Sequence, residues 1–107
     1  MKKFITINVA QAHLRWKQGS ALLIDIRDQH SYLVSHAPGA LHLANDKVQS
    51  FIRQTDFTKP LMVMCYHGNN SRDAAQYLLE QGFAAVYSVD GGFTAWAKQY
   101  PRDVTTK

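Results

Sequence analysis

The amino-acid sequence predicts an α/β fold in which about five short parallel strands carry helices on both faces. Short apolar runs alternate with amphipathic stretches along the 107 residues, and strands joined by helical crossovers form parallel sheets. The run at residues 21–26 is almost continuously apolar, which is typical of a strand covered on both faces. Because no repeat or linker interrupts this alternation, we expect a single domain over residues 1–107.

The first half of the chain is expected to alternate strands and helices three times. Residues 4–7 are β-prone, and Asn8 is a suitable N-cap for the helix that follows. This helix should run over residues 9–18, because its core-facing stripe recurs at helical spacing through Val9, Ala12, His13 and Trp16. The remaining elements are a strand at 21–26, a short helix from Asp28 to 34, a brief strand at 40–43 and a helix from Asn45 or Asp46 to about 54.

The second half is expected to contain two further strands, each followed by a helix. Pro60 precedes an apolar strand at residues 61–64, which ends at Cys65. Ser71 is the expected N-cap of the next helix, and Gly82 ends it. The last segments are expected to be a strand at 85–89, a turn at 90–92, a helix at 93–99 and a frayed tail from Asp103.

The composition excludes several classes of protein. Hydrophobic residues make up 46% of the chain and charged residues 19%, which argues against wholesale disorder. No apolar run approaches the ~18 residues that span a bilayer, so no membrane association is expected. The net charge is +4, but the basic residues are scattered and form no run. Nucleic acid is therefore not an expected partner.

The single cysteine, Cys65, limits both redox chemistry and metal binding. No disulfide can form within the chain, so nothing indicates an oxidising compartment and a cytoplasmic location is expected. A structural zinc site would need paired cysteines, and His36 and His42 do not form a recognisable ligand pair. We therefore expect no metal.

The position of Cys65 favours nucleophilic chemistry over an inert buried thiol, which is the alternative for a lone cysteine. Backbone N–H groups of the following loop and helix can converge on its sulfur and favour the thiolate, the reactive form. Gly68 would permit the tight curvature that this requires. The expected result is a lowered pKa of Cys65 and a binding loop that consists of Tyr66, His67, Gly68, Asn69, Asn70 and Ser71. His67 should contribute its backbone N–H, with a general-base role as the alternative.

A charged cluster is expected at the same edge of the sheet, where ligands bind beyond the carboxyl ends of strands. Asp25 and Arg27 lie at the end of another apolar strand. We expect Asp25 to accept hydrogen bonds from the turn near His36, and Arg27 to pair with a carboxylate such as Asp28 or Asp90. Both would then support the framework more than the chemistry.

Four segments, taken in order, resemble the motifs of the rhodanese sulfurtransferases. They are a strand signature ending in Asp-x-Arg, a His-x-Pro-Gly-Ala turn, a Cys-x-x-Gly loop and a Gly-Gly-x-x-x-Trp element, at residues 23–27, 35–40, 65–70 and 90–96. The resemblance covers residues 17–105 or thereabouts and implies a rhodanese-like fold without a cofactor. It also implies a two-step reaction, in which the Cys65 thiolate takes the outer sulfur of thiosulfate, releases sulfite and holds a persulfide. Implied acceptors are cyanide and dithiols such as reduced thioredoxin.

Two positions of the loop depart from the pattern of that family. Asn70 stands where Ser, Thr or Arg is usual, and altered substrate affinity is the expected consequence. Tyr66, expected to line the entrance with its ring, stands where the larger rhodaneses carry Arg, so less positive charge surrounds the mouth. Arg72 could compensate from the first helical turn. Phe93 and Trp96, at helical spacing, are expected in the core.

Two other functions are compatible with this architecture. Phosphatases and arsenate reductases of related fold have a loop one residue longer, with Arg six residues after the cysteine to bind phosphate in a bidentate manner. Here that position is Ser71, which argues against phosphate chemistry. The second alternative is a relay module that passes its persulfide to a dedicated protein partner.

Overall fold

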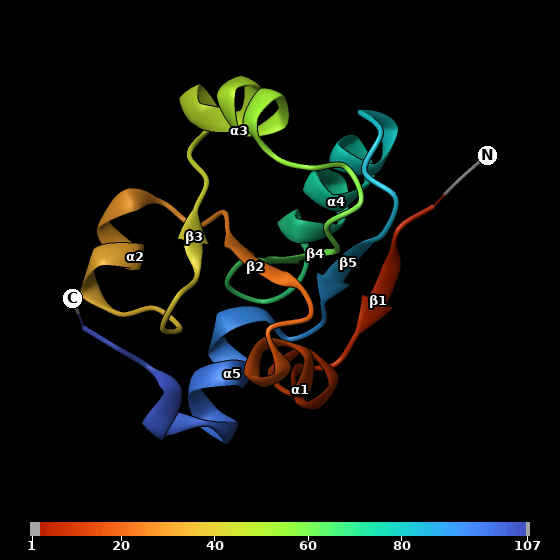
Figure 1. Cartoon of the computed structure of the whole chain (residues 1–107). Helices are drawn as coiled ribbons and strands as arrows, with labels where there is room; N and C mark the ends of the chain where they lie inside the picture. The colour runs from red at the N-terminus through yellow and green to blue at the C-terminus, as the bar shows by residue number, and fades with distance from the viewer. Residues whose placement is uncertain (1–2, 107) are drawn as a thin grey trace.

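In the computed structural model, which describes residues 3–106, five parallel strands form one sheet in the order β1-β5-β4-β2-β3 (Figure 1). The strands are β1 (Ile5–Ile7), β2 (Leu22–Asp25), β3 (Leu41–His42), β4 (Leu61–Met64) and β5 (Val86–Val89). The predicted fold class is therefore confirmed. β4 lies at the centre of the sheet, and all four of its residues are buried because helices cover both faces.

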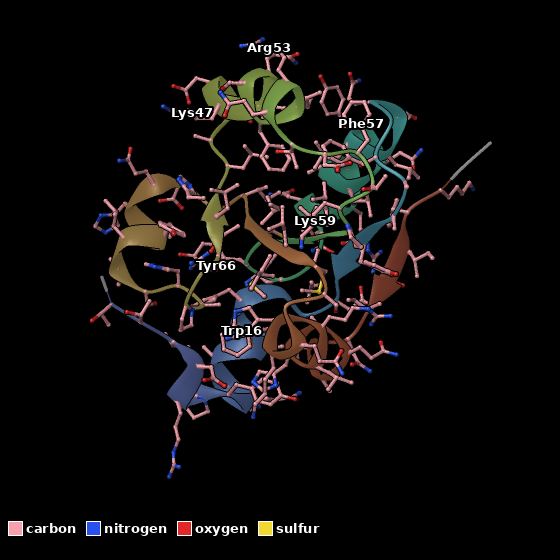
Figure 2. The ribbon with its side chains drawn as sticks, viewed as in Figure 1. Trp16, Lys47, Arg53, Phe57, Lys59 and Tyr66 are labelled. Carbon is pink, nitrogen blue, oxygen red and sulfur yellow. The ribbon has the colours of Figure 1, made fainter. Side chains whose placement is uncertain are left out.

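The helices divide between the two faces of the sheet (Figure 1). They are α1 (Val9–Gln18), α2 (Gln29–Val34), α3 (Val48–Gln54), α4 (Asn70–Glu80) and α5 (Gly92–Gln99), with 3₁₀ turns η1 (Asn45–Lys47) and η2 (Pro101–Asp103). α1 and α5 pack on one face around the fully buried Trp96, and Trp16 of α1 lies against α5 (Figure 2), with the two indole rings 5.3 Å apart. α3 and α4 cover the other face, around Phe51, Leu78 and Phe83. The predicted core positions of Phe93 and Trp96 are confirmed.

Most predicted elements form, although one helix is divided in two. Asn8 caps α1 as expected, since its Oδ1 accepts from the Gln11 N–H at 2.8 Å, while the Gln11 side chain accepts from the Asn8 N–H at 3.0 Å. The helix expected from Asn45 begins as the 3₁₀ turn η1 and continues as α3. Lys47 and Arg53 project from the outer side of this segment (Figure 2), in keeping with a dispersed basic surface.

The helix after Cys65 begins earlier than predicted. α4 starts at Asn70 with Asn69 as its N-cap, so the prediction of Ser71 as N-cap is wrong. Ser71 lies in the first turn instead, fully buried, with its Oγ 2.8 Å from the Oγ of Ser88 on β5. The sequence signal was misleading because serine is favoured at caps, whereas here its hydroxyl turns inward and finds a partner from another strand.

The tail is ordered where fraying was predicted, so that prediction is wrong as far as Thr105. The carbonyl of Asp103 accepts from the Trp96 Nε1–H at 2.8 Å, and its carboxylate lies 2.7 Å from the Nε2 of His13. Thr105 and His36 then exchange two backbone hydrogen bonds, at 2.8 and 2.9 Å, in an antiparallel bridge. These partners are distant in sequence, which is why local composition did not reveal them.

Within the described residues, no helix has both the length and the apolar character needed to cross a membrane.

Candidate active site

The sulfur of Cys65 lies at the carboxyl end of the central strand, where two backbone N–H groups meet it. The amide nitrogens of Gly68 and Ser71 lie 3.2 and 3.3 Å from Sγ, and both donate to it. The residue is only 5% exposed, so the sulfur is shielded yet still borders a pocket. A buried sulfur with convergent donors and no ionic partner can hold a negative charge without a neutralising side chain.

Hydrogen bonding lowers the pKa of the Cys65 thiol. Burial acts in the opposite sense and is the largest single influence, since it disfavours the charged form. The hydroxyl of Ser71 and the backbone N–H groups of Ser71, Gly68 and His67 together outweigh burial, so the pKa lies below the ordinary thiol value. The thiolate is thus favoured by backbone N–H groups of the loop, as the sequence analysis expected. The hydroxyl of Ser71 adds to their effect and was not expected.

The loop requires glycine at position 68 for two reasons. Gly68 has φ of +94°, a conformation that side-chain-bearing residues rarely adopt. A Cβ at this position would also lie 2.9 Å from the backbone nitrogen of Gly91 and 3.1 Å from the carbonyl oxygen of Val89. The loop is therefore pressed directly against the backbone that follows β5.

The start of α5 anchors the same loop from the other side. The N–H of Phe93 donates to the Cys65 carbonyl at 2.7 Å, and the N–H of Thr94 donates to the Tyr66 carbonyl at 3.0 Å. Gly92 makes this approach possible, because a Cβ there would lie 2.3 Å from the Cys65 oxygen. The Gly-Gly segment thus acts as the docking face for the cysteine loop.

Asp25 and Arg27 form a buried ion pair with each other beside the loop. The guanidinium of Arg27 donates to both carboxylate oxygens of Asp25 at 2.8–3.1 Å, and the backbone N–H of Arg27 donates to the same carboxylate at 3.0 Å. Nη2 also donates to the Ser35 carbonyl at 2.7 Å. The side chains are 0% and 2% exposed. The guanidinium also lies 4.0 Å from the ring centre of Phe93 and 5.2 Å from that of Tyr66.

These contacts correct two expectations. Arg27 pairs with Asp25, not with Asp28 or Asp90, because both side chains turn inward at the strand end. Asp25 accepts from Arg27 and not from the turn near His36, while the ring Nδ1 of His36 lies 2.7 Å from the carbonyl oxygen of Tyr32. The framework role expected for the pair agrees with its burial.

Arg72 is directed away from the cysteine. Its Nη2 lies 3.2 Å from the carboxylate of Asp90, and both side chains are about half exposed, at 52% and 46%. Arg72 is not among the residues that line the cysteine pocket, so the compensating charge suggested for it is absent there.

The cavity that borders Cys65 has a volume of about 280 Å³. Its walls come from the end of β2 and from the loop, and they comprise Ile26, Arg27, Asp28, Cys65, Tyr66, His67, Asn69 and Asn70. The Tyr66 ring is 43% exposed at the entrance, as predicted, and its hydroxyl donates to the Oγ of Ser31. His67, Asn69 and Asn70 are exposed on the same side. Within residues 3–106 no group of three or more potential metal-ligating side chains is gathered.

Sequence reasoning missed Ser88, Ser31 and the paired N–H groups at the start of α5. Ser88 lies on β5 between Tyr87 and Val89, and only its contact with Ser71 gives it a role. Every residue type except proline has a backbone N–H, so residue type does not reveal which of them donate. The motif around Gly92 was the one available indication that the start of α5 contacts the cysteine loop.

The fold and the site together define a cysteine-loop α/β domain, and the chain belongs to the family of the Rhodanese-like domain, whose family model matches residues 8–99.

Solved structures share the fold over most of the chain. A rhodanese-related protein from Thermoplasma volcanium superposes with a TM-score of 0.82 at 23% identity and covers 97% of this chain and 100% of its own. The reduced CoADR-RHD protein of Bacillus anthracis gives a TM-score of 0.82 at 22% identity, but the match covers 95% of this chain and 18% of that protein. A Rhodopseudomonas palustris protein of unknown function, described as a possible tyrosine phosphatase, has a TM-score of 0.76 at 24% identity over 90% of this chain and 81% of its own. At these identities the similarities establish the fold alone.

Proposed function

We propose that this chain is a thiosulfate sulfurtransferase that carries sulfur as a persulfide on Cys65. One observation supports this function above the others: the Sγ of Cys65 receives N–H groups from Gly68 and Ser71 and borders a small pocket. Such a cradle stabilises negative charge on sulfur while leaving the sulfur able to form a new bond. No cofactor or metal is needed for this chemistry.

The first half of the reaction loads the cysteine. The Cys65 thiolate attacks the outer sulfur of thiosulfate, a Cys65–sulfur bond forms, and the sulfur–sulfur bond of thiosulfate breaks. Sulfite leaves with the electron pair of that bond. A lowered pKa of Cys65 increases the thiolate fraction at neutral pH, which favours this step.

The second half of the reaction transfers the sulfur from Cys65 to an acceptor. A nucleophilic acceptor attacks the outer sulfur of the persulfide, the bond to Sγ breaks, and Cys65 returns as the thiolate. Cyanide would leave as thiocyanate, and a dithiol such as reduced thioredoxin would take the sulfur as a persulfide of its own. The amides of Gly68 and Ser71 are positioned to stabilise the returning charge on Sγ.

The geometry offers little support for phosphate chemistry. A phosphatase of this architecture needs a guanidinium fork directed at the bound phosphate. Arg72 instead pairs with Asp90, and Nε and Nη2 of Arg27 donate to Asp25 and Ser35, so the fork of Arg27 is not directed at the pocket as a bidentate clamp. We expect no robust turnover of p-nitrophenyl phosphate.

Mass spectrometry of the intact protein tests the proposal. After thiosulfate treatment and removal of the excess, the wild-type chain should gain about 32 Da, one sulfur atom, and cyanide should remove it. Cys65→Ser should show no gain. Absence of any cyanide-sensitive gain on the wild type would overturn the proposal. Slow discharge to cyanide with rapid discharge to one protein would instead indicate a persulfide relay.

A further inference from the structure

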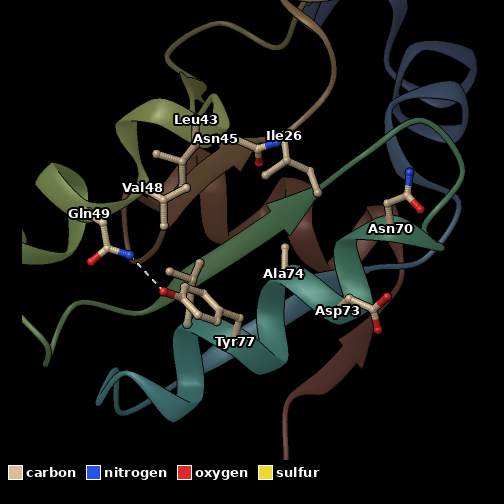
Figure 3. Close-up of a pocket in the computed structure, with 10 residues that line it drawn as sticks. Ile26, Leu43, Asn45, Val48, Gln49, Asn70, Asp73, Ala74 and Tyr77 are labelled. Carbon is tan, nitrogen blue, oxygen red and sulfur yellow. Dashed lines mark hydrogen bonds between the residues drawn. The ribbon is translucent and has the colours of Figure 1, made fainter.

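A second and larger cavity adjoins the cysteine pocket. It has a volume of about 560 Å³ and lies between η1, α3 and the first two turns of α4 (Figure 3). Its lining consists of Ile26, Leu43, Asn45, Val48, Gln49, Asn70, Asp73, Ala74, Tyr77 and Leu78. A volume of this size is typical of sites for small organic molecules. The proposed transfer from thiosulfate to cyanide gives it no role.

The two cavities are neighbours, because Ile26 and Asn70 line both. Figure 3 shows Ile26 beyond the end of β4 and Asn70 at the start of α4, on the side where the cysteine loop joins these two elements. At the far end, the Nε2 of Gln49 donates to the Tyr77 hydroxyl at 3.0 Å and links α3 to α4. A molecule held in this groove near Asn70 would therefore lie beside the pocket that borders Cys65.

The chemistry of the lining selects the kind of molecule. The middle of the groove is apolar, through Leu43, Val48, Ala74 and Leu78. Its uncharged polar groups are the side-chain amides of Asn45, Gln49 and Asn70 and the hydroxyl of Tyr77. The one charged side chain is Asp73, and no lysine, arginine or histidine lines the groove in the part of the chain that the structure describes. Within residues 3–106 the Asp73 carboxylate has no ion-pair partner.

The cysteine pocket has a different lining. Its two charged residues, Arg27 and Asp28, are already bound to Asp25 and to Ser31, and the amides of the loop meet the sulfur of Cys65. The groove, with its unpaired carboxylate, disfavours an anionic occupant and favours a neutral or cationic one. The two steps of the reaction would thus use neighbouring sites with different linings.

We infer that the groove is the binding site for the body of the sulfur acceptor, and that this acceptor is a small organic thiol whose body is neutral or cationic. The inference rests on the proposed persulfide chemistry of Cys65. The acceptor thiolate attacks the outer persulfide sulfur, a bond forms between these two sulfurs, and the bond to Sγ breaks with its electron pair remaining on Cys65. The proton of the acceptor thiol passes to solvent, and no further oxidant or reductant takes part.

The test compares acceptors of similar size and different charge. Cys65 is loaded with inorganic polysulfide, so that the test does not depend on thiosulfate as donor, and the gain of about 32 Da is verified. Discharge is then measured with cysteamine, N-acetylcysteamine and 3-mercaptopropionate, and each rate is divided by the thiolate concentration of that thiol. Cyanide serves as the acceptor that needs no groove.

We expect saturable discharge to the cationic and neutral thiols, with kcat/KM about fivefold above that for the anionic thiol, as one exposed carboxylate can supply. Asp73→Lys should reverse the order of the charged thiols. Asn45→Trp, a change at an exposed position on the rim, should lower the ratio of thiol discharge to cyanide discharge by about tenfold. Glu80→Lys, on the same helix outside the groove, is the matched control for charge and should leave the order unchanged.

Rates that follow thiol basicity alone, with no response to Asp73→Lys or Asn45→Trp, would overturn the inference. So would rapid discharge to a protein dithiol alone, since a protein partner would then be the occupant. Both outcomes differ from failure of the proposed function. If that function is wrong, thiosulfate will not load Cys65, although polysulfide still will.

Discussion

Asp25 and Cys65 stand at the carboxyl ends of neighbouring strands, yet their negative charges are stabilised by different groups. Asp25 is paired with Met64, the residue before Cys65, in the β2–β4 register. Its carboxylate is bound by a guanidinium and a backbone N–H, all of them buried. Among residues 3–106 the sulfur of Cys65 has no ionic partner, and it relies on amides and one hydroxyl of its own loop.

The difference separates a structural charge from a reactive one. An ion pair that is buried and fully hydrogen-bonded has no remaining capacity to react, and removing one partner leaves the other charge uncompensated. Backbone donors stabilise the thiolate without covering the whole sulfur, so the side toward the pocket stays available. Four predictions test this contrast, and they begin with the largest effect.

Asp25→Ala should destabilise the fold by about 3–5 kcal/mol, because the guanidinium of Arg27 would remain buried without its partner. Urea unfolding followed by circular dichroism measures this. Asp46→Ala, at an exposed acidic position, should cost less than about 0.5 kcal/mol. The double change Asp25→Leu with Arg27→Met should recover much of the loss. Equal costs for Asp25→Ala and Asp46→Ala would show that the pair is not structural.

Gly68→Ala should cost about 1–3 kcal/mol through its strained backbone, and it should also displace the loop and slow sulfur transfer by more than tenfold. Gly39→Ala is the matched control. Gly39 also has a positive φ, of +78°, but a Cβ there meets nothing within 4 Å. Gly39→Ala should therefore lose a comparable amount of backbone stability and keep its activity. A loss of activity in both variants would remove the special role of the contact with Gly91.

Ser71→Ala should raise the pKa of Cys65 and lower the thiolate fraction, so the rate of persulfide formation at neutral pH should fall by about fivefold. The rate of the wild type should rise with pH and level off below the ordinary thiol range, and in Ser71→Ala this rise should move to higher pH. Alkylation by iodoacetamide as a function of pH measures the same ionisation.

The lowered pKa of Cys65 also sets the direction in which the stability of the folded chain changes with pH. Ionisation of Cys65 stabilises the folded chain above the pKa of the unfolded thiol, and this contribution is lost as the pH falls through the lower pKa of the folded state. Ser88→Ala is the control, because it removes the partner of the Ser71 hydroxyl but keeps the hydroxyl that lowers the pKa of Cys65. A pH profile unchanged by Ser71→Ala would assign the lowered pKa to the amides alone.

Arg72→Gln should have the smallest effect, with a stability change within about 0.5 kcal/mol and a change in KM for thiosulfate within about twofold. Its guanidinium is half exposed and pairs with Asp90 outside the cysteine pocket. Steady-state kinetics at low and high salt measure the effect. A tenfold rise in KM would mean that Arg72 does attract the substrate.

Local pattern was sufficient wherever a residue acts through its own segment. The strand that ends at Cys65, the tight bend at Gly68 and the cap at Asn8 were all predictable, because chain position and residue type decide them. The roles of Ser71 and the tail were not, because Ser88, His13 and His36 reach them from distant parts of the chain. Side-chain orientation at a strand end is likewise set by packing, which is why Arg27 was assigned the wrong carboxylate.

The sequence by itself determined the parallel α/β sheet, the location of the sulfur at a strand end and the family motifs, since these depend on periodicity and on residues close together in the chain. The tertiary structure alone decided which donors meet that sulfur, which charges neutralise one another and where a second cavity opens beside the first. The physical reason is that hydrogen bonds and ion pairs act over a few ångströms in space, and only folding brings distant residues within that range.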